Sequence, residues 1–290
     1  MTKQYGILAF PAKHSLSPVL YSTAFKELDI DAQYKTFEIP EKDLDDFMFQ
    51  VKDGLVDRLS VSLPYKEAVL DYMTHLSEDA KKIGAVNTVL NKNGVLYGDN
   101  TDFLGSNRAL KETVGDLKNK QFVILGAGGA ARAVIYGLLK EGASILGILN
   151  RTLERAESLA KEFSEMFNVK IKAYSAENLA TTLPFKNEIL QSETILIQTT
   201  SIWTLHDDIS AEKAEEFCPA EYIKLFSAVM DIIYKPSLTP LLETAKNLDK
   251  RIITGDEMFL YQAAEQFKLF TEKEAPIEIM KKALIENLAQ

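Results

Sequence analysis

The chain has 290 residues, which is too long for one small hydrophobic core and suits two domains. Hydrophobic residues make up 46% and charged residues 26%, a composition typical of globular proteins. The formal net charge of −9 opposes binding to nucleic acid, although a local site for a small anion stays compatible with it.

The first hundred residues alternate predicted strands with predicted helices. Residues 5–9 form an apolar run that predicts a short buried strand. Ser17-Pro18 then suits the start of a helix, with Ser17 as N-cap and proline at the first helical position. Further strands are expected at 34–39 and 59–63, each of which ends at or next to a proline.

Ser15 and Ser17 stand two residues apart just before this helix. In an extended segment, side chains at this spacing point the same way, so both hydroxyls could bind one carboxylate. The alternative is that Ser17 only caps the helix and Ser15 only occupies a turn.

Three more polar residues of this half are candidates for chemistry. Lys66 follows the strand that ends near Pro64, where it could face a cleft, or it could be an ordinary surface lysine. Asp102 is predicted to open a helix, either as a functional acid or as a first-turn aspartate. Asn87, next to Thr88 on a strand, could bind a polyol or lie on an exposed strand face.

The second half has a regular strand and helix rhythm that predicts an α/β fold with a doubly wound parallel sheet. The expected strands are 122–125, 145–149, 169–173, 195–199, 229–233 and 252–254. The domain boundary is expected near residue 103, with one domain at 1–102 and the second at 103–254. Helices are expected at 259–268 and 277–287, within the C-terminal segment 255–290.

A glycine-rich loop follows the first strand of this half and opens its helix. Its G-x-G-x-x-A pattern is formed by Gly126, Ala127, Gly128, Gly129, Ala130 and Ala131. In such a loop the glycines allow a tight turn and a close approach to a pyrophosphate, which the helix N-terminus then binds. We expect dinucleotide binding here. A glycine-rich packing turn without a ligand is the alternative.

The end of the next strand bears on which dinucleotide binds. NAD-binding proteins usually carry Asp or Glu there, whereas this chain has Asn150-Arg151-Thr152 and, one turn later, Arg155. An arginine can bind the 2′-phosphate of NADP through several donors, and an acid would repel it. These residues favour NADP over NAD. The alternative is that both arginines form a solvated helix face.

Cysteine and histidine usage limits other classes of site. Cys218 is the one cysteine, so no intrachain disulfide can form, which suits a reducing compartment. The histidines are far apart in the sequence, so no metal site is expected (His14, His75, His206). No apolar run approaches the length of a membrane span, and we expect a cytoplasmic protein with no membrane contact.

Taken together, the motifs resemble the shikimate dehydrogenase family over nearly the whole chain. They occur in order as Ser15-Leu16-Ser17-Pro18, Pro64-x-Lys66, Gly84–Thr88, Asn100-Thr101-Asp102, Gly126–Ala131, Asn150-Arg151-Thr152, Asp231-x-x-Tyr234-x-Pro236, Thr239-Pro240, Gly255, Met258, Gln262 and Phe267. The resemblance implies a substrate domain followed by an NADP-binding Rossmann domain, a cleft between them, and C-terminal helices that return to the substrate domain.

The resemblance also implies roles for individual residues. Ser15 and Ser17 would bind the substrate carboxylate, and Asn87, Asp102 and Gln262 the ring hydroxyls. Ser62 and Tyr234 would line the substrate site, and Gly255 the cofactor site. In the implied reaction, NADPH gives a hydride to the ring ketone of 3-dehydroshikimate, Lys66 gives the proton, and Asp102 positions Lys66. The partner is a small-molecule substrate, and the chain would be a monomer or a homodimer.

Several positions depart from the family pattern. Ser60-Val61-Ser62 stands where the family usually has Asn-Val-Thr, Gln198 replaces an asparagine, and Trp203 replaces part of a small glycine-containing loop. Two alternatives therefore stay open beside shikimate dehydrogenase. One is a paralogue that acts on quinate or another cyclohexane polyol carboxylate. The other is a non-catalytic NADP-binding sensor.

Overall fold

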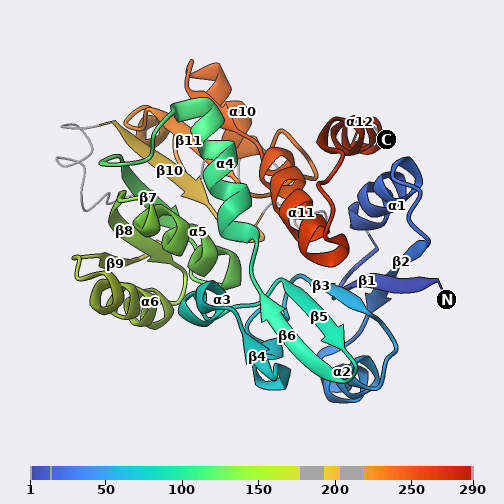
Figure 1. The fold of residues 1–290 in the computed structure, drawn as a ribbon. Coiled ribbons are helices and arrows are strands. Elements are labelled where there is room, and N and C mark those ends of the chain that lie inside the picture. The colour runs from blue at the N-terminus through green and yellow to red at the C-terminus, as the bar shows by residue number, and fades with distance from the viewer. Residues whose placement is uncertain (1, 14, 177–192, 203–217, 289–290) are drawn as a thin grey trace. The chain divides into compact units, whose positions relative to one another are not determined.

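The computed structural model describes residues 2–13, 15–176, 193–202 and 218–288. The chain divides into two compact units, each of which is described by itself. The first consists of Met1–Asp102 with Leu260–Gln290, and the second of Phe103–Phe259. The first unit therefore combines the two ends of the chain, coloured blue to green and red in Figure 1.

The first unit is built on a mixed sheet of six strands in the order β2-β1-β3-β5-β6-β4. The strands are β1 (Lys3–Ala9), β2 (Ala32–Glu38), β3 (Arg58–Val61), β4 (His75–Leu76), β5 (Thr88–Lys92) and β6 (Val95–Asp99). β1 runs parallel to β2 and β3, whereas β5 runs antiparallel to both β3 and β6. The β5–β6 hairpin turns at Asn93-Gly94, where both residues have positive φ, as a tight hairpin turn requires.

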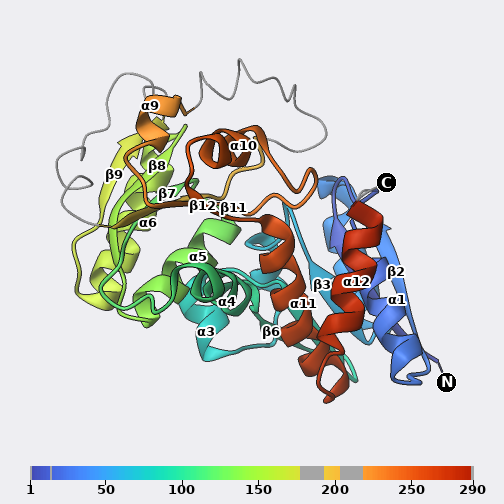
Figure 2. The ribbon, with the colours of Figure 1, turned by 90° about the horizontal axis from the view of Figure 1, so that it is seen from above.

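Helices cover this sheet on both sides. One side holds a core of apolar residues from α2 (Leu44–Lys52), the short helix α3 (Glu78–Ile83) and the strands. The other side packs aromatic rings of α1 (Ser17–Glu27) and α11 (Gly255–Thr271), for example Tyr5 on Phe25 and Tyr21 on Phe267. α12 (Ile277–Leu288) lies beside α1, as Figures 1 and 2 both show.

One detail of α1 corrects the sequence analysis. The N-cap is Leu16, so Ser17 is the first residue of the helix and not its cap, and Pro18 is at the second position. No side chain caps this helix. Proline still fits, because the first N–H groups of a helix have no partner within the helix.

The second unit is a parallel sheet of six strands in the order β12-β11-β10-β7-β8-β9. These are β7 (Gln121–Leu125), β8 (Ser144–Asn150), β9 (Lys172–Ser175), β10 (Thr194–Gln198), β11 (Ala228–Asp231) and β12 (Arg251–Ile253). Successive strands run outward from β7 on one side and from β10 on the other, which is the doubly wound order of dinucleotide-binding folds. The α/β fold class and the parallel sheet are thus confirmed.

The helices of this unit are α4 (Asp102–Val114), α5 (Gly129–Lys140), α6 (Leu153–Phe167), α9 (Ala220–Ile223) and α10 (Pro240–Asn247). Figure 2 shows α5 and α10 on opposite faces of the sheet. The predicted strand at 169–173 is wrong in position, because β9 begins only at Lys172. Asn168 ends α6 with a left-handed backbone, and the N–H of Val169 still bonds to the carbonyl of Ser164, so the chain turns before it becomes extended.

Candidate active site and cofactor-binding loop

Lys66 and Asp102 form an ion pair in the first unit, with 2.5 Å between Lys66 Nζ and Asp102 Oδ2. The Lys66 side chain is 14% exposed and that of Asp102 only 4%. Lys66 lies in the loop after β3, and its carbonyl accepts a hydrogen bond from the N–H of Val86. Asp102 is the first residue of α4, and its N–H bonds to the side chain of Asn100. The backbone of both residues is therefore held by a hydrogen bond to a neighbouring segment.

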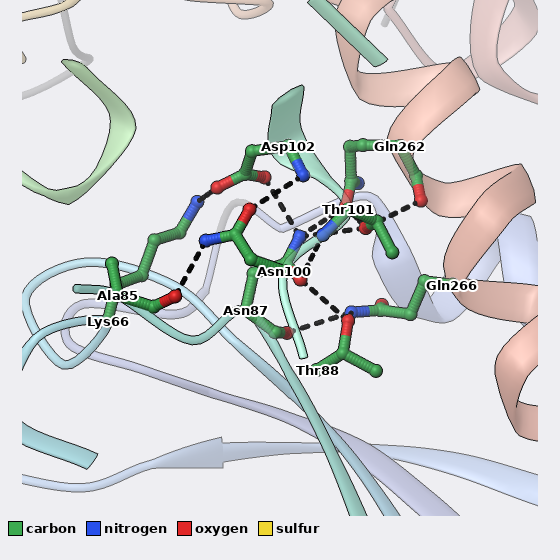
Figure 3. Close-up of polar contacts among 9 residues, drawn as sticks. All are labelled: Lys66, Ala85, Asn87, Thr88, Asn100, Thr101, Asp102, Gln262 and Gln266. Atoms are coloured by element: carbon green, nitrogen blue, oxygen red, sulfur yellow. Dashed lines mark hydrogen bonds and ion pairs between the residues drawn. The ribbon is translucent and has the colours of Figure 1, made fainter. Parts of the chain in front are cut away.

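Asn87 holds the other oxygen of the Asp102 carboxylate. Its Nδ2 donates to Asp102 Oδ1 at 2.9 Å and also to Thr101 Oγ1 at 2.9 Å. Its Oδ1 accepts from the backbone N–H of Thr101 and from the hydroxyl of Thr88. Figure 3 shows Asn87 next to Asp102, with Lys66 on the far side of the carboxylate. Asn87 is 2% exposed, so the reading of a polar residue on an exposed strand face is wrong.

Gln262 of α11 joins the same group. Its Oε1 accepts from Asn87 Nδ2 at 3.2 Å, and its backbone carbonyl accepts from the hydroxyl of Thr101 at 3.0 Å. Three segments far apart in the sequence therefore meet around one carboxylate: the loop after β3, the β5–β6 hairpin with the start of α4, and α11 (Figure 3).

This arrangement can hold and deliver a proton. The Asp102 carboxylate receives hydrogen bonds from Lys66 on one oxygen and from Asn87 on the other. Burial strengthens such charge-assisted contacts, because little water competes for them. The ammonium group of Lys66 carries three N–H donors, so binding to one Asp102 oxygen leaves it further N–H bonds. The pair therefore suits general acid–base chemistry on an oxygen atom.

The predicted serines of the first unit make other hydrogen bonds. Ser17 is buried at the start of α1, and its N–H bonds to Ser15 Oγ at 3.3 Å. Ser62 is half-buried, and its N–H bonds to the carbonyl of Leu8. Among the described residues, no hydrogen bond connects these three serines to Lys66 or Asp102. A joint role with the pair stays a prediction for all three.

Ser60 points into the protein rather than to an open surface. It is 5% exposed, its hydroxyl donates to Gln266 Oε1, and it accepts from the hydroxyl of Tyr34 at 2.5 Å. Gln266 was not among the predicted site residues, although it lies one helical turn after Gln262 and so on the same face of α11. That spacing was the available signal.

The glycine loop of the second unit lies where β7 ends beside β10 and β8. Gly126 has φ +113°, and a Cβ atom there would collide with Thr199 Oγ1. Glycine is required at this position both by its backbone and by the neighbouring strand. A Cβ atom at Gly128, the N-cap of α5, would meet nothing within 4 Å. The loop is thus tight at its first glycine and open at its second.

The Asn150-Arg151-Thr152 run lies next to this loop. Leu125 and Leu149 are paired in the sheet, and the N–H of Gly126 bonds to the carbonyl of Leu149, directly before Asn150. Asn150 Nδ2 donates to the carbonyl of Thr152. Arg151, Thr152 and Arg155 are exposed, with Thr152 as the N-cap of α6. The second strand end therefore presents positive charge beside the glycine loop.

Other predicted residues of this unit have structural partners. Tyr234 stacks on Phe259, with 4.5 Å between ring centroids. Gly255 begins α11 where a Cβ atom would collide with the Ile233 carbonyl oxygen. Gln198 is fully buried, and its Oε1 accepts from the N–H of Thr200 at 2.5 Å. Trp203 lies outside the described residues.

The described residues include no helix with both the length and the apolar character that a membrane crossing requires. They also contain no group of three or more His, Cys, Asp or Glu side chains placed to hold a metal ion.

Fold and site together define a two-unit α/β protein with a Rossmann-type sheet and a part-buried lysine paired with a buried carboxylate. Family models match its main parts. Residues 7–89 match the shikimate dehydrogenase substrate binding domain, 108–205 the shikimate / quinate 5-dehydrogenase model, and 255–285 the shikimate 5'-dehydrogenase C-terminal domain.

Individual relatives agree over the full length. The NADP(+) shikimate dehydrogenase of Thermococcus kodakarensis is 37% identical over 289 residues, which cover 100% of this chain and 98% of the relative. The crystal structure of shikimate dehydrogenase from Aquifex aeolicus superposes with a TM-score of 0.83 at 34% identity, covering 98% and 97% of the two chains. A Thermus thermophilus shikimate 5-dehydrogenase in complex with NADP(H) and shikimate gives 0.81 at 30% identity, covering 98% and 99%. The chain belongs to the shikimate dehydrogenase family.

Proposed function

We propose that this protein catalyses the reversible, NADP-dependent reduction of 3-dehydroshikimate to shikimate, a step of aromatic amino acid biosynthesis. The observation that carries the proposal is the Lys66–Asp102 pair, with 2.5 Å between Nζ and Oδ2, a part-buried lysine and a buried carboxylate, in a chain of this family. The full-length relatives from Thermococcus kodakarensis and Methanopyrus kandleri are NADP(+) shikimate dehydrogenases. The retained pair argues against a non-catalytic sensor, which would not need it.

The substrate roles follow from chemistry and position. Ser15 and Ser17 are proposed to bind the carboxylate, and Ser62 to line the same site. Asn87, Asp102 and Gln262 are proposed to bind ring hydroxyls. A substrate hydroxyl could take the place of the 3.2 Å hydrogen bond between Asn87 and Gln262. A role of Tyr234 near the substrate stays a prediction.

The glycine loop and its neighbours fit NADP. Gly126 makes the tight turn and Gly128 leaves open space, so the segment up to Ala131 can cradle a pyrophosphate at the start of α5. Arg151 would bind the 2′-phosphate, with support from Asn150, Thr152 and Arg155. A role of Gly255 in cofactor binding stays a prediction.

The chain's own residues account for the proton. NADPH, when bound, supplies the hydride that reduces the ring ketone. Lys66 donates a proton to the ketone oxygen as the hydroxyl forms, and in the reverse direction neutral Lys66 takes that proton back. Asp102 keeps the Lys66 ammonium in place, and Asn87 keeps Asp102 in place.

Finer points belong to the same proposal. A single cysteine, buried at position 218, suits a cytoplasmic enzyme. A monomer or a homodimer is compatible with the chain. A paralogue that prefers quinate is the second candidate, and the specific observation that favours testing it is Ser60-Val61-Ser62 in place of the family's usual Asn-Val-Thr.

Initial rates of NADP and NAD reduction, each with shikimate and with quinate, test the proposal by absorbance. We expect the fastest turnover with NADP and shikimate. A preference for quinate would identify the paralogue. Cofactor binding without turnover of either acid would leave only the sensor.

A further inference from the structure

The hydrogen bonds around Asp102 continue deeper into the first unit. The Thr88 hydroxyl donates to Asn87 Oδ1 at 2.6 Å. Gln266 Nε2 donates to Thr88 Oγ1 at 2.7 Å and to the Asn87 backbone carbonyl at 2.8 Å. Thr88 is fully buried and Gln266 is 2% exposed. Figure 3 shows this chain of three residues, Gln266, Thr88 and Asn87, which we call the amide chain.

Two backbone groups fix which way the two amides point. The Asn87 carbonyl can only accept, so the Gln266 atom that faces it must be the nitrogen. The Thr101 N–H can only donate, so the Asn87 atom that faces it must be the oxygen. Consequently the Asn87 nitrogen faces Asp102, as the hydrogen bond to Oδ1 requires.

The Thr88 hydroxyl links these two amides in one direction only. Its oxygen receives an N–H from Gln266, and its own hydrogen goes to Asn87 Oδ1. Every bond along the amide chain therefore donates toward Asp102, from Gln266 to Thr88, to Asn87 and to the carboxylate. Reversal at any one link would place two acceptors or two donors face to face in a dry environment.

The far end of the amide chain is also fixed. Gln266 Oε1 accepts from the hydroxyl of Tyr21 at 2.7 Å and from that of Ser60, so all four hydrogen-bonding positions of this amide are used. Burial raises the pKa of the Tyr21 phenol well above its ordinary value. Tyr21 therefore stays a donor at every pH at which the enzyme would be assayed.

We infer that Gln266 and Thr88 are positioning residues of this enzyme: they orient the Asn87 amide so that it donates to Asp102, which in turn holds Lys66 toward the substrate oxygen. The inference rests on the proposed function, since it concerns the reaction of the Lys66–Asp102 pair. Neither residue touches the pair, so both act through Asn87.

Paired substitutions at Thr88 test this inference. Thr88→Val keeps the shape and removes the hydroxyl, whereas Thr88→Ser keeps the hydroxyl and removes a methyl group. We expect kcat for shikimate oxidation to fall about tenfold in Thr88→Val, since small misplacements of catalytic groups are costly, while the KM for NADP stays unchanged. Thr88→Ser should keep kcat within about twofold of the unchanged protein.

Tyr5→Phe is the matched control for lost stability. It removes a buried hydroxyl of the same unit that bonds to the Phe270 carbonyl, away from the amide chain. Both variants are assayed well below their melting temperatures, with rates divided by the folded fraction. Equal kcat values for Thr88→Val and Tyr5→Phe would overturn the inference. Loss of kcat in Thr88→Ser as large as in Thr88→Val would also overturn it.

Two outcomes need separate handling. If the unchanged protein does not oxidise shikimate, the proposed function fails first, and the inference fails with it. If Thr88→Val does not fold, Ser60→Ala tests the amide chain at its Gln266 end. This substitution removes one of the two hydroxyl donors to Gln266 Oε1. A kcat about two- to threefold below that of Tyr5→Phe would support the inference, and an equal kcat would overturn it.

Discussion

In the first unit, buried polar side chains bind one another around Asp102, whereas in the second unit the arginines next to the glycine loop have exposed side chains. Asn87 and Asp102 are 2% and 3% exposed, while Arg151 and Arg155 are exposed. The first arrangement fixes the Lys66 ammonium group in one place. The second leaves room for a large anion to bind. The difference fits the tasks proposed for the two sites, proton transfer and cofactor binding.

The largest effect is expected from removal of the proton donor in the buried group. Lys66→Met keeps much of the side-chain length but has no proton to give, so kcat should fall by about 10²- to 10⁴-fold. Steady-state rates with shikimate and NADP measure this. Lys92→Met, at an exposed lysine of the same unit, is the matched control and should keep its activity. Comparable rates in the two variants would remove Lys66 from the mechanism.

A change on the exposed side should affect binding instead. Arg151→Ala would lose charge-assisted hydrogen bonds to the 2′-phosphate, so the KM for NADP should rise about tenfold or more. The KM for NAD, which lacks that phosphate, should stay the same. Arg108→Ala, at an exposed arginine of α4, controls for a general loss of positive charge. A parallel rise for both cofactors in Arg151→Ala would contradict the assignment.

A smaller effect on stability is expected from Asp231, which is buried at the end of β11. Burial raises the pKa of this carboxyl to about 7, although hydrogen bonds from the Ile233 N–H and the Thr239 hydroxyl oppose the shift. The folded protein then binds the proton more tightly than the unfolded chain. Asp231 therefore stabilises the fold below about pH 4, and this contribution is lost as the pH rises to about 7.

Asparagine cannot ionise, so the Asp231→Asn variant should not show this loss of stability as the pH rises. Between pH 5 and pH 8 the unchanged protein should lose about 2 to 3 kcal/mol of unfolding free energy relative to the variant. Urea unfolding at the two pH values measures it. Glu243→Gln, at an exposed carboxyl of α10, should follow the unchanged protein. If Asp231→Asn shows the same pH dependence as the unchanged protein, Asp231 does not titrate in this range.

The features that the sequence predicted well depend on local chemistry. The glycine loop needs only a strand, a turn and a helix in succession, and the structure has them at 121–140. The β5–β6 hairpin was not predicted, although Asn93-Gly94 is a strong hairpin signal. The boundary of β9 was misplaced because apolar residues continue through the turn that ends α6.

The amide chain could not be predicted from local patterns. Thr88 and Gln266 are 178 positions apart in the sequence, and no periodicity relates them. Thr88 resembles any β-branched residue in a strand, and Gln266 any polar residue of a helix. Only the folded unit shows that a backbone carbonyl and a backbone N–H force both amides into one orientation.

A double-mutant cycle on Lys66 and Asp102 tests the central claim, that these two residues work as one unit. kcat for shikimate oxidation would be measured in Lys66→Met, Asp102→Asn and the double variant, each verified as folded by circular dichroism. We predict that the double variant is about as slow as Lys66→Met alone. The effects of substitutions on kcat do not add when the two residues act as one catalytic unit. Losses that multiply in the double variant would show that the two residues act independently and would contradict the account.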